Sequence, residues 1–170
     1  MTSGLLAAAG ETAVGTAVAE RFVGFALDPS DDPGSTLRFT PEVRLGLGSE
    51  LVIERPGPAL HDDQSWLLDT QEFRGYLGPF SALRLIRHHA EDMGSATVDG
   101  PRAAFELTDG ASADCVGNPR RVPPTLASLH RVSVQPSAHS RSTCLLWFSI
   151  DLFLDDEGRV AAVTLDLWEP

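Results

Sequence analysis

The sequence predicts a single α+β domain in which helices come first and an antiparallel sheet follows. A helix is predicted over about residues 12–27, because apolar side chains recur there every three or four positions. A β-hairpin is predicted near the end of the chain, where strands over residues 142–154 and 159–168 flank an acidic turn at residues 155–158. The apolar residues of the helix are Val14, Val18, Phe22 and Phe25.

Two further elements are predicted in the first half of the chain. Residues 36–54 are rich in Leu, Val and Ile, which favours one or two short strands bent at Gly46 and Gly48. A second helix is predicted over about residues 80–93, with Ser81 as its N-cap. The domain as a whole spans residues 1–170.

The sheet is predicted to continue over residues 96–168. Its strands in this part include residues 96–107 and 126–134, in addition to the hairpin. Gly, Asp, Asn and Pro mark residues 108–124 as a long loop. Residues 60–73 are mixed and polar, which indicates irregular structure or a short helix.

Composition and charge exclude several classes of function. The chain of 170 residues has 13 Lys and Arg against 24 Asp and Glu, so its formal net charge is −11. This charge opposes approach to nucleic-acid backbones and anionic membranes. The sequence has no run of about 18 apolar residues and no basic start of a signal peptide. We therefore expect a cytoplasmic protein that binds neither nucleic acid nor membrane.

The two cysteines, Cys115 and Cys144, have no further Cys or His at metal-ligand spacing. Neither a disulfide framework nor a zinc site is predicted, and both thiols are expected to be reduced. The sequence also lacks a phosphate-binding glycine loop, a nucleophile elbow and a His-Glu-x-x-His motif. No metal and no cofactor are expected.

The strand predicted over residues 142–154 carries different chemistry on its two faces. One face is wholly apolar, and the other is mixed and includes Asp151. The apolar face consists of Leu146, Phe148, Ile150, Leu152 and Leu154, and the mixed face of Trp147, Ser149, Asp151 and Phe153.

The end of the chain reads SIDLFLDDEGRV at residues 149–160, followed by Trp-Glu-Pro at residues 168–170. This pattern resembles the closing hairpin of the nuclear transport factor 2-like superfamily, which includes ketosteroid isomerase, SnoaL-like polyketide cyclases and polyether epoxide hydrolases. Residues 38–43 and 78–83 resemble the entry to its first strand and the start of its third helix. The resemblance implies a cone-shaped, strongly curved, mostly antiparallel sheet wrapped around N-terminal helices, as in cystatin-like folds. It also implies a homodimer.

By this resemblance Asp151 matches the oxyanion-hole aspartate of the ketosteroid isomerases. An aspartate inside an apolar cone would lose the hydration of its charged form and keep its proton, so it could donate a hydrogen bond to a developing oxyanion. Glu54 or His130 would be the base, because a second ionisable group in the pocket completes acid/base catalysis. The side chains expected to line the pocket for an apolar ligand are Trp66, Tyr76, His89, Trp147 and Phe153.

Each candidate also has a structural interpretation. Asp151 could face solvent or a dimer partner, and Glu54 could be a solvated residue near a strand end. His89 could be a partly buried, hydrogen-bonded histidine, and a structural role is equally compatible with His130. The aromatic residues could fill the core or an oligomer interface.

The sequence leads to two hypotheses of function. The first is a cofactor-independent enzyme, a cyclase, isomerase or epoxide hydrolase, acting by general acid/base catalysis on an apolar polyketide-like or terpenoid molecule. The second is a non-catalytic small-molecule-binding or dimerisation domain of the same fold. Two departures from the isomerase pattern support the second: Phe22 and Phe25 occupy the helix that should carry a tyrosine, and Arg55 stands at the position of the base. The enzyme is nevertheless placed ahead, because a pocket carboxylate is costly to keep buried without a use.

Overall fold

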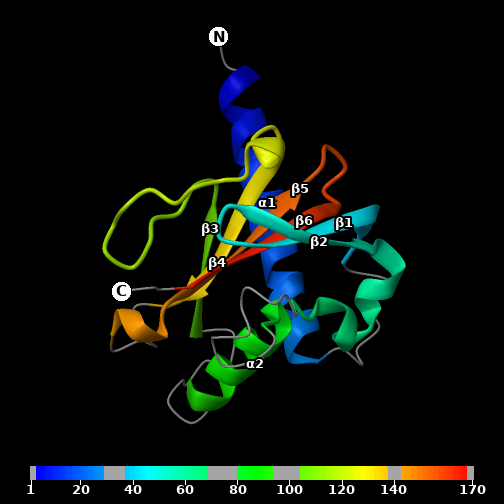
Figure 1. Ribbon diagram of the computed structural model, residues 1–170. Coiled ribbons are helices and arrows are strands. Elements are labelled where there is room, and N and C mark those ends of the chain that lie inside the picture. Colours follow the sequence, from blue (N-terminus) through cyan, green and yellow to red (C-terminus); the bar gives the residue numbers. More distant parts are fainter. Residues whose placement is uncertain (1–2, 29–36, 69–79, 94–103, 138–142, 168–170) are drawn as a thin grey trace.

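The computed structural model describes residues 3–28, 37–68, 80–93, 104–137 and 143–167 (Figure 1). Within these residues the α-helices are α1 (Ser3–Leu27) and α2 (Ala82–Met93). The strands are β1 (Phe39–Leu47), β2 (Glu50–Pro56), β3 (Phe105–Asp109), β4 (His130–Pro136), β5 (Phe148–Leu154) and β6 (Val160–Leu167). Short 3-10 helices are η2 (Gly57–His61), η3 (Asp63–Trp66), η6 (Pro124–Leu126) and η7 (Cys144–Leu146). The predicted α+β class is confirmed.

The strands of the described residues form one open, mixed sheet in the order β2-β1-β6-β5-β4-β3. Neighbouring strands are antiparallel except β1 and β6, which run parallel. This pair departs from the antiparallel sheet predicted from the sequence. Two parallel neighbouring strands need a long connection, and here the whole chain between β1 and β6 provides it. No local sequence pattern therefore indicates that these two strands pair.

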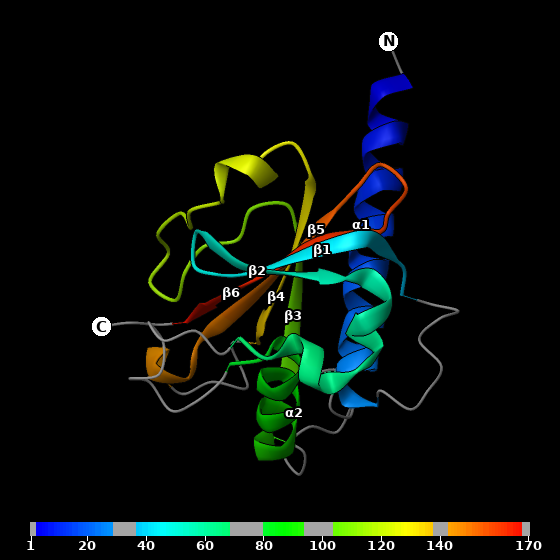
Figure 2. The same cartoon turned by 45° about the vertical axis from the view of Figure 1, so that its right-hand side comes forward.

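The helices pack against one face of the sheet, which we call the inner face. The core on this side contains Phe22 of α1, Ile86 of α2, and Ile150 and Leu152 of β5, all fully buried. α1 runs against β3 and β4. In Figure 2 the first turns of α1 extend beyond the sheet. Burial of these apolar side chains is the main source of stability on this face.

Aromatic rings close the core near the start of β1. The ring centroid of Trp66 lies 5.6 Å from that of Phe22 and 6.0 Å from that of Phe39. Trp66 Nε1 donates a 2.8 Å hydrogen bond to the Leu60 carbonyl oxygen, so the indole is buried with its polar group satisfied. The segment predicted as irregular structure or a short helix at residues 60–73 forms, in its described part, the end of η2 and all of η3, and it contributes to the core.

Both predicted helices form, and one is longer than expected. The Ser81 hydroxyl accepts a 3.5 Å hydrogen bond from the backbone N–H of Arg84, which caps α2 as predicted. α1 begins at Ser3 rather than near residue 12. Its first turns are rich in Ala and Leu, which favour a helix without producing an apolar repeat. No helix in the described part of the chain is both long and apolar enough to span a membrane.

The strands form with shifted boundaries. Residues 36–54 contain the expected pair of strands, which turn at Gly48 with a φ of 55° and change register beside Gly46. The strand predicted over residues 142–154 is shorter than expected, because η7 precedes β5.

The region between α2 and β4 is only partly as predicted. β3 contains the last residues of the strand expected at 96–107, whereas residues 94–103 lie outside the described part. The strand expected at 126–134 begins later, at His130, because Leu126 belongs to η6. The long loop predicted at residues 108–124 is confirmed from residue 110 on, because β3 extends to Asp109.

The predicted hairpin connects β5 to β6. The Asp155 carboxylate accepts hydrogen bonds from the backbone N–H of Glu157 at 3.0 Å and of Arg159 at 2.9 Å, and from Arg159 Nε at 2.8 Å. Gly158 has a φ of 70°, which glycine adopts without strain. Burial alone would raise the pKa of Asp155, but hydrogen bonds from Arg159 and Glu157 outweigh it and lower the pKa.

Removing this acceptor should weaken the hairpin. We expect Asp155→Ala to lower the free energy of unfolding by about 1–2 kcal/mol, because three donors lose their partner. The exposed neighbour Asp156 is the matched control, and Asp156→Ala should change stability by less than about 0.5 kcal/mol. Urea denaturation measures both, and equal effects of the two substitutions would contradict this role of Asp155.

Candidate functional site

The face of the sheet opposite the helices, which we call the outer face, carries Asp151 and Phe153 of β5. Residues 110–129, which connect β3 to β4, lie over this face, and we call them the covering loop. Leu126 of the loop packs on Phe153 in a small, fully buried apolar cluster. Asp151 therefore lies beneath the chain's own loop.

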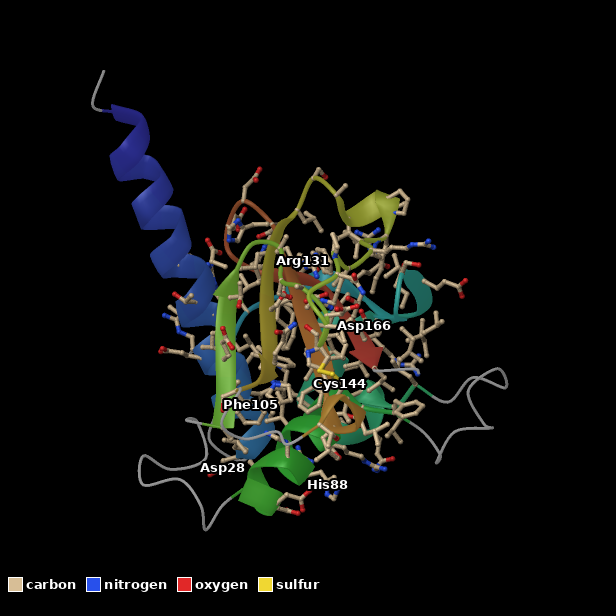
Figure 3. All side chains as sticks on the ribbon, turned by 90° about the vertical axis from the view of Figure 1, so that its left-hand side faces the viewer. Asp28, His88, Phe105, Arg131, Cys144 and Asp166 are labelled. Atoms are coloured by element: carbon tan, nitrogen blue, oxygen red, sulfur yellow. A yellow bond between two sulfur atoms is a disulfide. The ribbon has the colours of Figure 1, made fainter. Side chains whose placement is uncertain are left out.

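Asp151 is held by two arginines, Arg120 and Arg131, the second of which is labelled in Figure 3. Its Oδ1 accepts hydrogen bonds from Arg120 Nη2 at 2.5 Å and from the Ser133 hydroxyl at 2.6 Å. Its Oδ2 accepts a hydrogen bond from Arg131 Nη2 at 3.0 Å. The side chains of Asp151 and Arg120 are only 4% and 2% exposed, so water screens this ion pair weakly.

The surroundings of Asp151 differ from the apolar cone expected from the sequence. The side chain is buried, but its neighbours are guanidinium groups and hydroxyls rather than hydrocarbon. This is the arrangement of an ion-paired carboxylate and not of a protonated acid. The expected apolar enclosure was wrong, and the catalytic role of Asp151 stays a prediction that these contacts do not favour.

Arg120 links the Asp151 cluster to the rest of the outer face. Its Nη2 donates a 2.7 Å hydrogen bond to the Ser112 hydroxyl, and its Nη1 lies 3.5 Å from Asp166 Oδ2. Its guanidinium carbon lies 5.7 Å from the ring centroid of Trp147, within cation–π range. Burial raises the pKa of Asp166, and the charge of Arg120 acts in the opposite direction.

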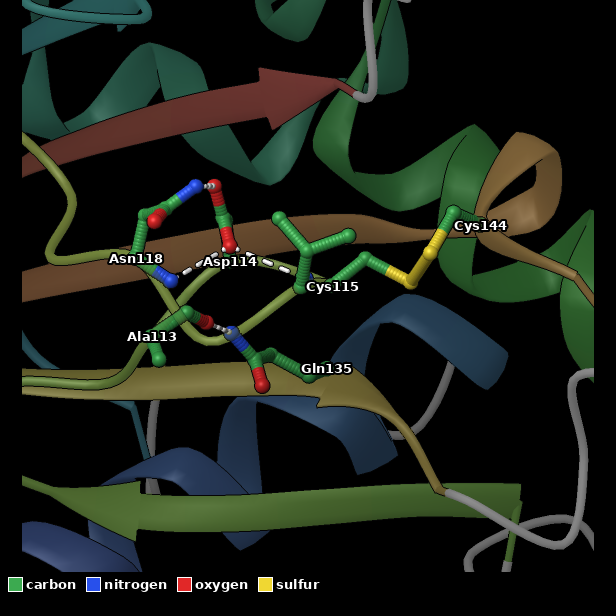
Figure 4. The surroundings of a disulfide bond; sticks show 7 residues. Ala113, Asp114, Cys115, Asn118, Gln135 and Cys144 are labelled. Carbon is green, nitrogen blue, oxygen red and sulfur yellow. Dashed lines mark hydrogen bonds between the residues drawn. A yellow bond between two sulfur atoms is a disulfide. The ribbon is translucent and has the colours of Figure 1, made fainter.

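Cys115 and Cys144 form a disulfide, which corrects the expectation that both thiols are reduced. The two residues are 29 positions apart in sequence, but their Cα atoms are 5.6 Å apart. Asp114 accepts hydrogen bonds from the backbone N–H of Val116 at 3.0 Å and of Asn118 at 2.8 Å, which forms a tight turn around Cys115 (Figure 4). Cys144 is the first residue of η7, the short helix that precedes β5.

His130 lies on the inner face, opposite Asp151. It pairs with Leu154 across β4 and β5, and its Nε2 is 2.5 Å from Asp109 Oδ1. α1 passes over this pair at Gly15, where a Cβ would be 2.5 Å from the same oxygen. A carboxylate that orients a partly exposed imidazole is an arrangement found in general bases. The sheet, however, separates this pair from Asp151.

Glu54 is exposed on the outer face, at the edge strand β2. Cross-strand pairs lead from Glu54 through Arg44 and Ala162 to Phe153, which places all four on one face. Two strands lie between β2 and β5, so the lateral distance to Asp151 is about 14 Å at the usual strand spacing. The three predicted catalytic groups do not share one site.

The predicted pocket residues are also divided between the two faces. Trp66 and His89 lie in the packing between the helices and the inner face, whereas Trp147 and Phe153 lie on the outer face. All four are buried, which fits the core-filling interpretation. Tyr76 lies outside the described residues.

His89 has the contacts of a structural histidine. Its ring centroid lies 5.4 Å from that of Phe105 and 5.8 Å from that of Phe148. Burial lowers the pKa of His89, although a hydrogen bond with the backbone of Ala104 acts in the opposite direction. The neutral imidazole is therefore the favoured form in the folded protein.

Arg120 and Arg131 were not among the predicted site residues. Arg131 gave a weak signal, because it is a charged residue inside a predicted strand, directly before Val132. Arg120 gave none, because it lies in an irregular loop and its partner Asp151 is 31 positions away.

The role of Asp151 can be separated from that of an ordinary surface carboxylate. We expect Asp151→Asn to lower the free energy of unfolding by about 3–5 kcal/mol, because it removes the charge that both buried arginines share and leaves only Asp166, 3.5 Å from Arg120. Glu54→Gln, the matched change at an exposed position of the same face, should cost less than about 0.5 kcal/mol. Denaturant unfolding measures both variants, and a similarly small loss in Asp151→Asn would refute the ion-pair account.

His89 should make stability fall in acid. Below its ordinary pKa of 6.5 the unfolded state takes up a proton that the folded state resists, so stability is full above this pH and is lost as the pH falls. His89→Leu should remove this part of the acid sensitivity. His88→Gln, on the exposed side of α2, should retain it, and thermal unfolding between neutral pH and mild acid compares the three proteins. An unchanged pH dependence in His89→Leu would rule out the assignment.

No group of three or more His, Cys, Asp or Glu side chains that could hold a metal ion occurs in the described residues. No protein-family model, curated protein or solved structure matches this chain. The likeness of residues 149–160 to a superfamily hairpin remains an expectation from the sequence.

Proposed function

We propose that the chain is a non-catalytic interaction domain that contacts another protein beside its disulfide. One observation carries this proposal. Val116, Leu145 and Leu146 are 59%, 73% and 56% exposed, and they lie within two positions after the two bonded cysteines in sequence. We call these three side chains the apolar patch. Exposed large apolar side chains that gather in one place are typical of protein interaction sites.

The state of Asp151 supports a non-catalytic role. Both of its carboxyl oxygens accept hydrogen bonds from arginines, and the covering loop occupies the space that a substrate would need. With Asp166 and the two arginines, Asp151 forms a group that is electrically neutral when all four are ionised. Such a group stabilises the attachment of the loop, and its hydrogen bonds direct the Asp151 carboxylate at arginines rather than at a ligand.

The finer fold proposal is a cone-shaped domain of the nuclear transport factor 2-like type. The element order and the packing of both helices on one face of the sheet support it. A homodimer, as the resemblance implies, would form away from the region of the outer face that the covering loop occupies. The disulfide favours an oxidising compartment over the cytoplasm expected from the sequence, because disulfides persist mainly under oxidising conditions.

A second candidate function is the acid/base enzyme acting on an apolar small molecule, with a different catalytic group. The short contact between His130 Nε2 and Asp109 Oδ1 favours it, because the carboxylate fixes the orientation of a partly exposed imidazole. In this reading His130 is the base and Asp151 is structural. Loss of turnover in His130→Gln, with turnover kept in Glu54→Gln, would support it.

Site-specific photo-crosslinking in the producing cells tests the interaction domain. A photoreactive residue at Leu145 should give one discrete protein adduct, and the adduct should disappear when Leu146→Asp is added. The control position is Val14, which is 55% exposed on α1 and should give no such adduct. The proposal fails if Leu145 gives no adduct, or if the same adduct forms from Val14.

A further inference from the structure

We propose that the Cys115–Cys144 disulfide is a redox site, reduced and re-formed by a protein dithiol that docks on the apolar patch. This inference rests on the proposed function, because it assigns a partner class to the same patch. The two sulfur atoms join segments outside the sheet, namely the tight turn of the covering loop and η7. Both cysteine residues are partly exposed, and Figure 4 shows the bond between them. Exchange requires that a thiolate of the partner attack one of these two sulfur atoms.

The fold around the disulfide has other anchors. Arg120 holds the covering loop to Asp151, and Leu126 holds it to Phe153. The turn at Cys115 is closed by the hydrogen bonds of Asp114 and by a β-bridge between residues 113 and 119. Breaking the disulfide therefore disconnects this turn from η7 without opening the core, which is the condition for a bond that is exchanged in the folded protein.

The exchange follows ordinary thiol chemistry. A thiolate of the partner attacks one sulfur of the disulfide, the bond between Cys115 and Cys144 breaks, and a mixed disulfide forms. The released cysteine leaves as a thiolate and takes a proton from water. The second thiolate of the partner then attacks the partner's own sulfur in the mixed disulfide, which forms a disulfide within the partner and releases the other cysteine as a thiolate. Two electrons pass from the partner dithiol to this chain, and the reverse sequence re-forms the bond.

The surroundings of the sulfur atoms define the chemistry of the partner surface. The attacking sulfur must come within bonding distance of Cys115 or Cys144, so the surface around it meets the side chains that flank them. The residues that follow the cysteines, Val116, Leu145 and Leu146, are apolar and exposed, whereas Asp114 and Thr143 precede them. A partner whose reactive cysteine is surrounded by apolar surface gains burial there, whereas a small dithiol in solution does not.

Reduction kinetics of the purified, oxidised chain test this inference, with thioredoxin as the protein dithiol and dithiothreitol as the small one. Mass spectrometry after alkylation reports the free thiols. We expect thioredoxin to react faster than dithiothreitol by about tenfold or more, and the double variant Leu145→Asp, Leu146→Asp to lose about tenfold of the thioredoxin rate. The dithiothreitol rate should stay within about twofold. Val14→Asp, an exposed apolar position outside the patch, should leave both rates unchanged.

The inference is overturned if thioredoxin is no faster than dithiothreitol, if the patch variant reacts like the wild type, or if both reagents slow equally. The last result would mean that the substitutions altered the disulfide and not a docking surface. These outcomes are separate from failure of the proposed function, because the photo-crosslink at Leu145 can persist when dithiol exchange does not depend on the patch.

Discussion

The ion pair between Arg120 and Asp151 joins the covering loop to the centre of the sheet, and the outer half of the molecule depends on it. A carboxylate buried in the middle of a strand is costly unless cationic donors compensate it. Arg131 provides one donor from the neighbouring strand, and Arg120 provides the other from the loop. The loop must therefore stay in place for the strand to keep its aspartate, and Leu126 and the disulfide restrain the same segment.

The candidate functional side chains lie on different faces of the sheet. Alternation along β5 sends Ile150 and Leu152 into the helix-covered core and Asp151 to the other side. The same alternation along β4 sends His130 to the inner face and Arg131 to the outer face. The sheet consequently separates His130 from Asp151, and two strands separate Glu54 from Asp151 on the outer face, although each of the three lies in a strand that the sequence predicted at least in part.

The sequence predicts most clearly the elements that depend on neighbours in the chain. The hairpin at Asp155 and the helix capped by Ser81 are examples, because each is specified by residues within a few positions. The alternating pattern also indicated that Asp151 lies on a mixed face. It could not indicate the partner, since Arg120 lies in an irregular loop 31 positions away. The disulfide and the parallel pairing of β1 with β6 were not predicted either, because both join distant segments and have no local sequence signal.

The position of the Arg120 guanidinium is the most direct test of this account. Proton–nitrogen NMR spectra of the folded chain should show separate, slowly exchanging guanidinium N–H signals for Arg120, with Asp151 as their acceptor. Arg84, which is exposed on α2, provides the reference for a solvated arginine. If the Arg120 signals exchange with water as fast as those of Arg84, the guanidinium is not buried against Asp151, and the account of the outer face is wrong.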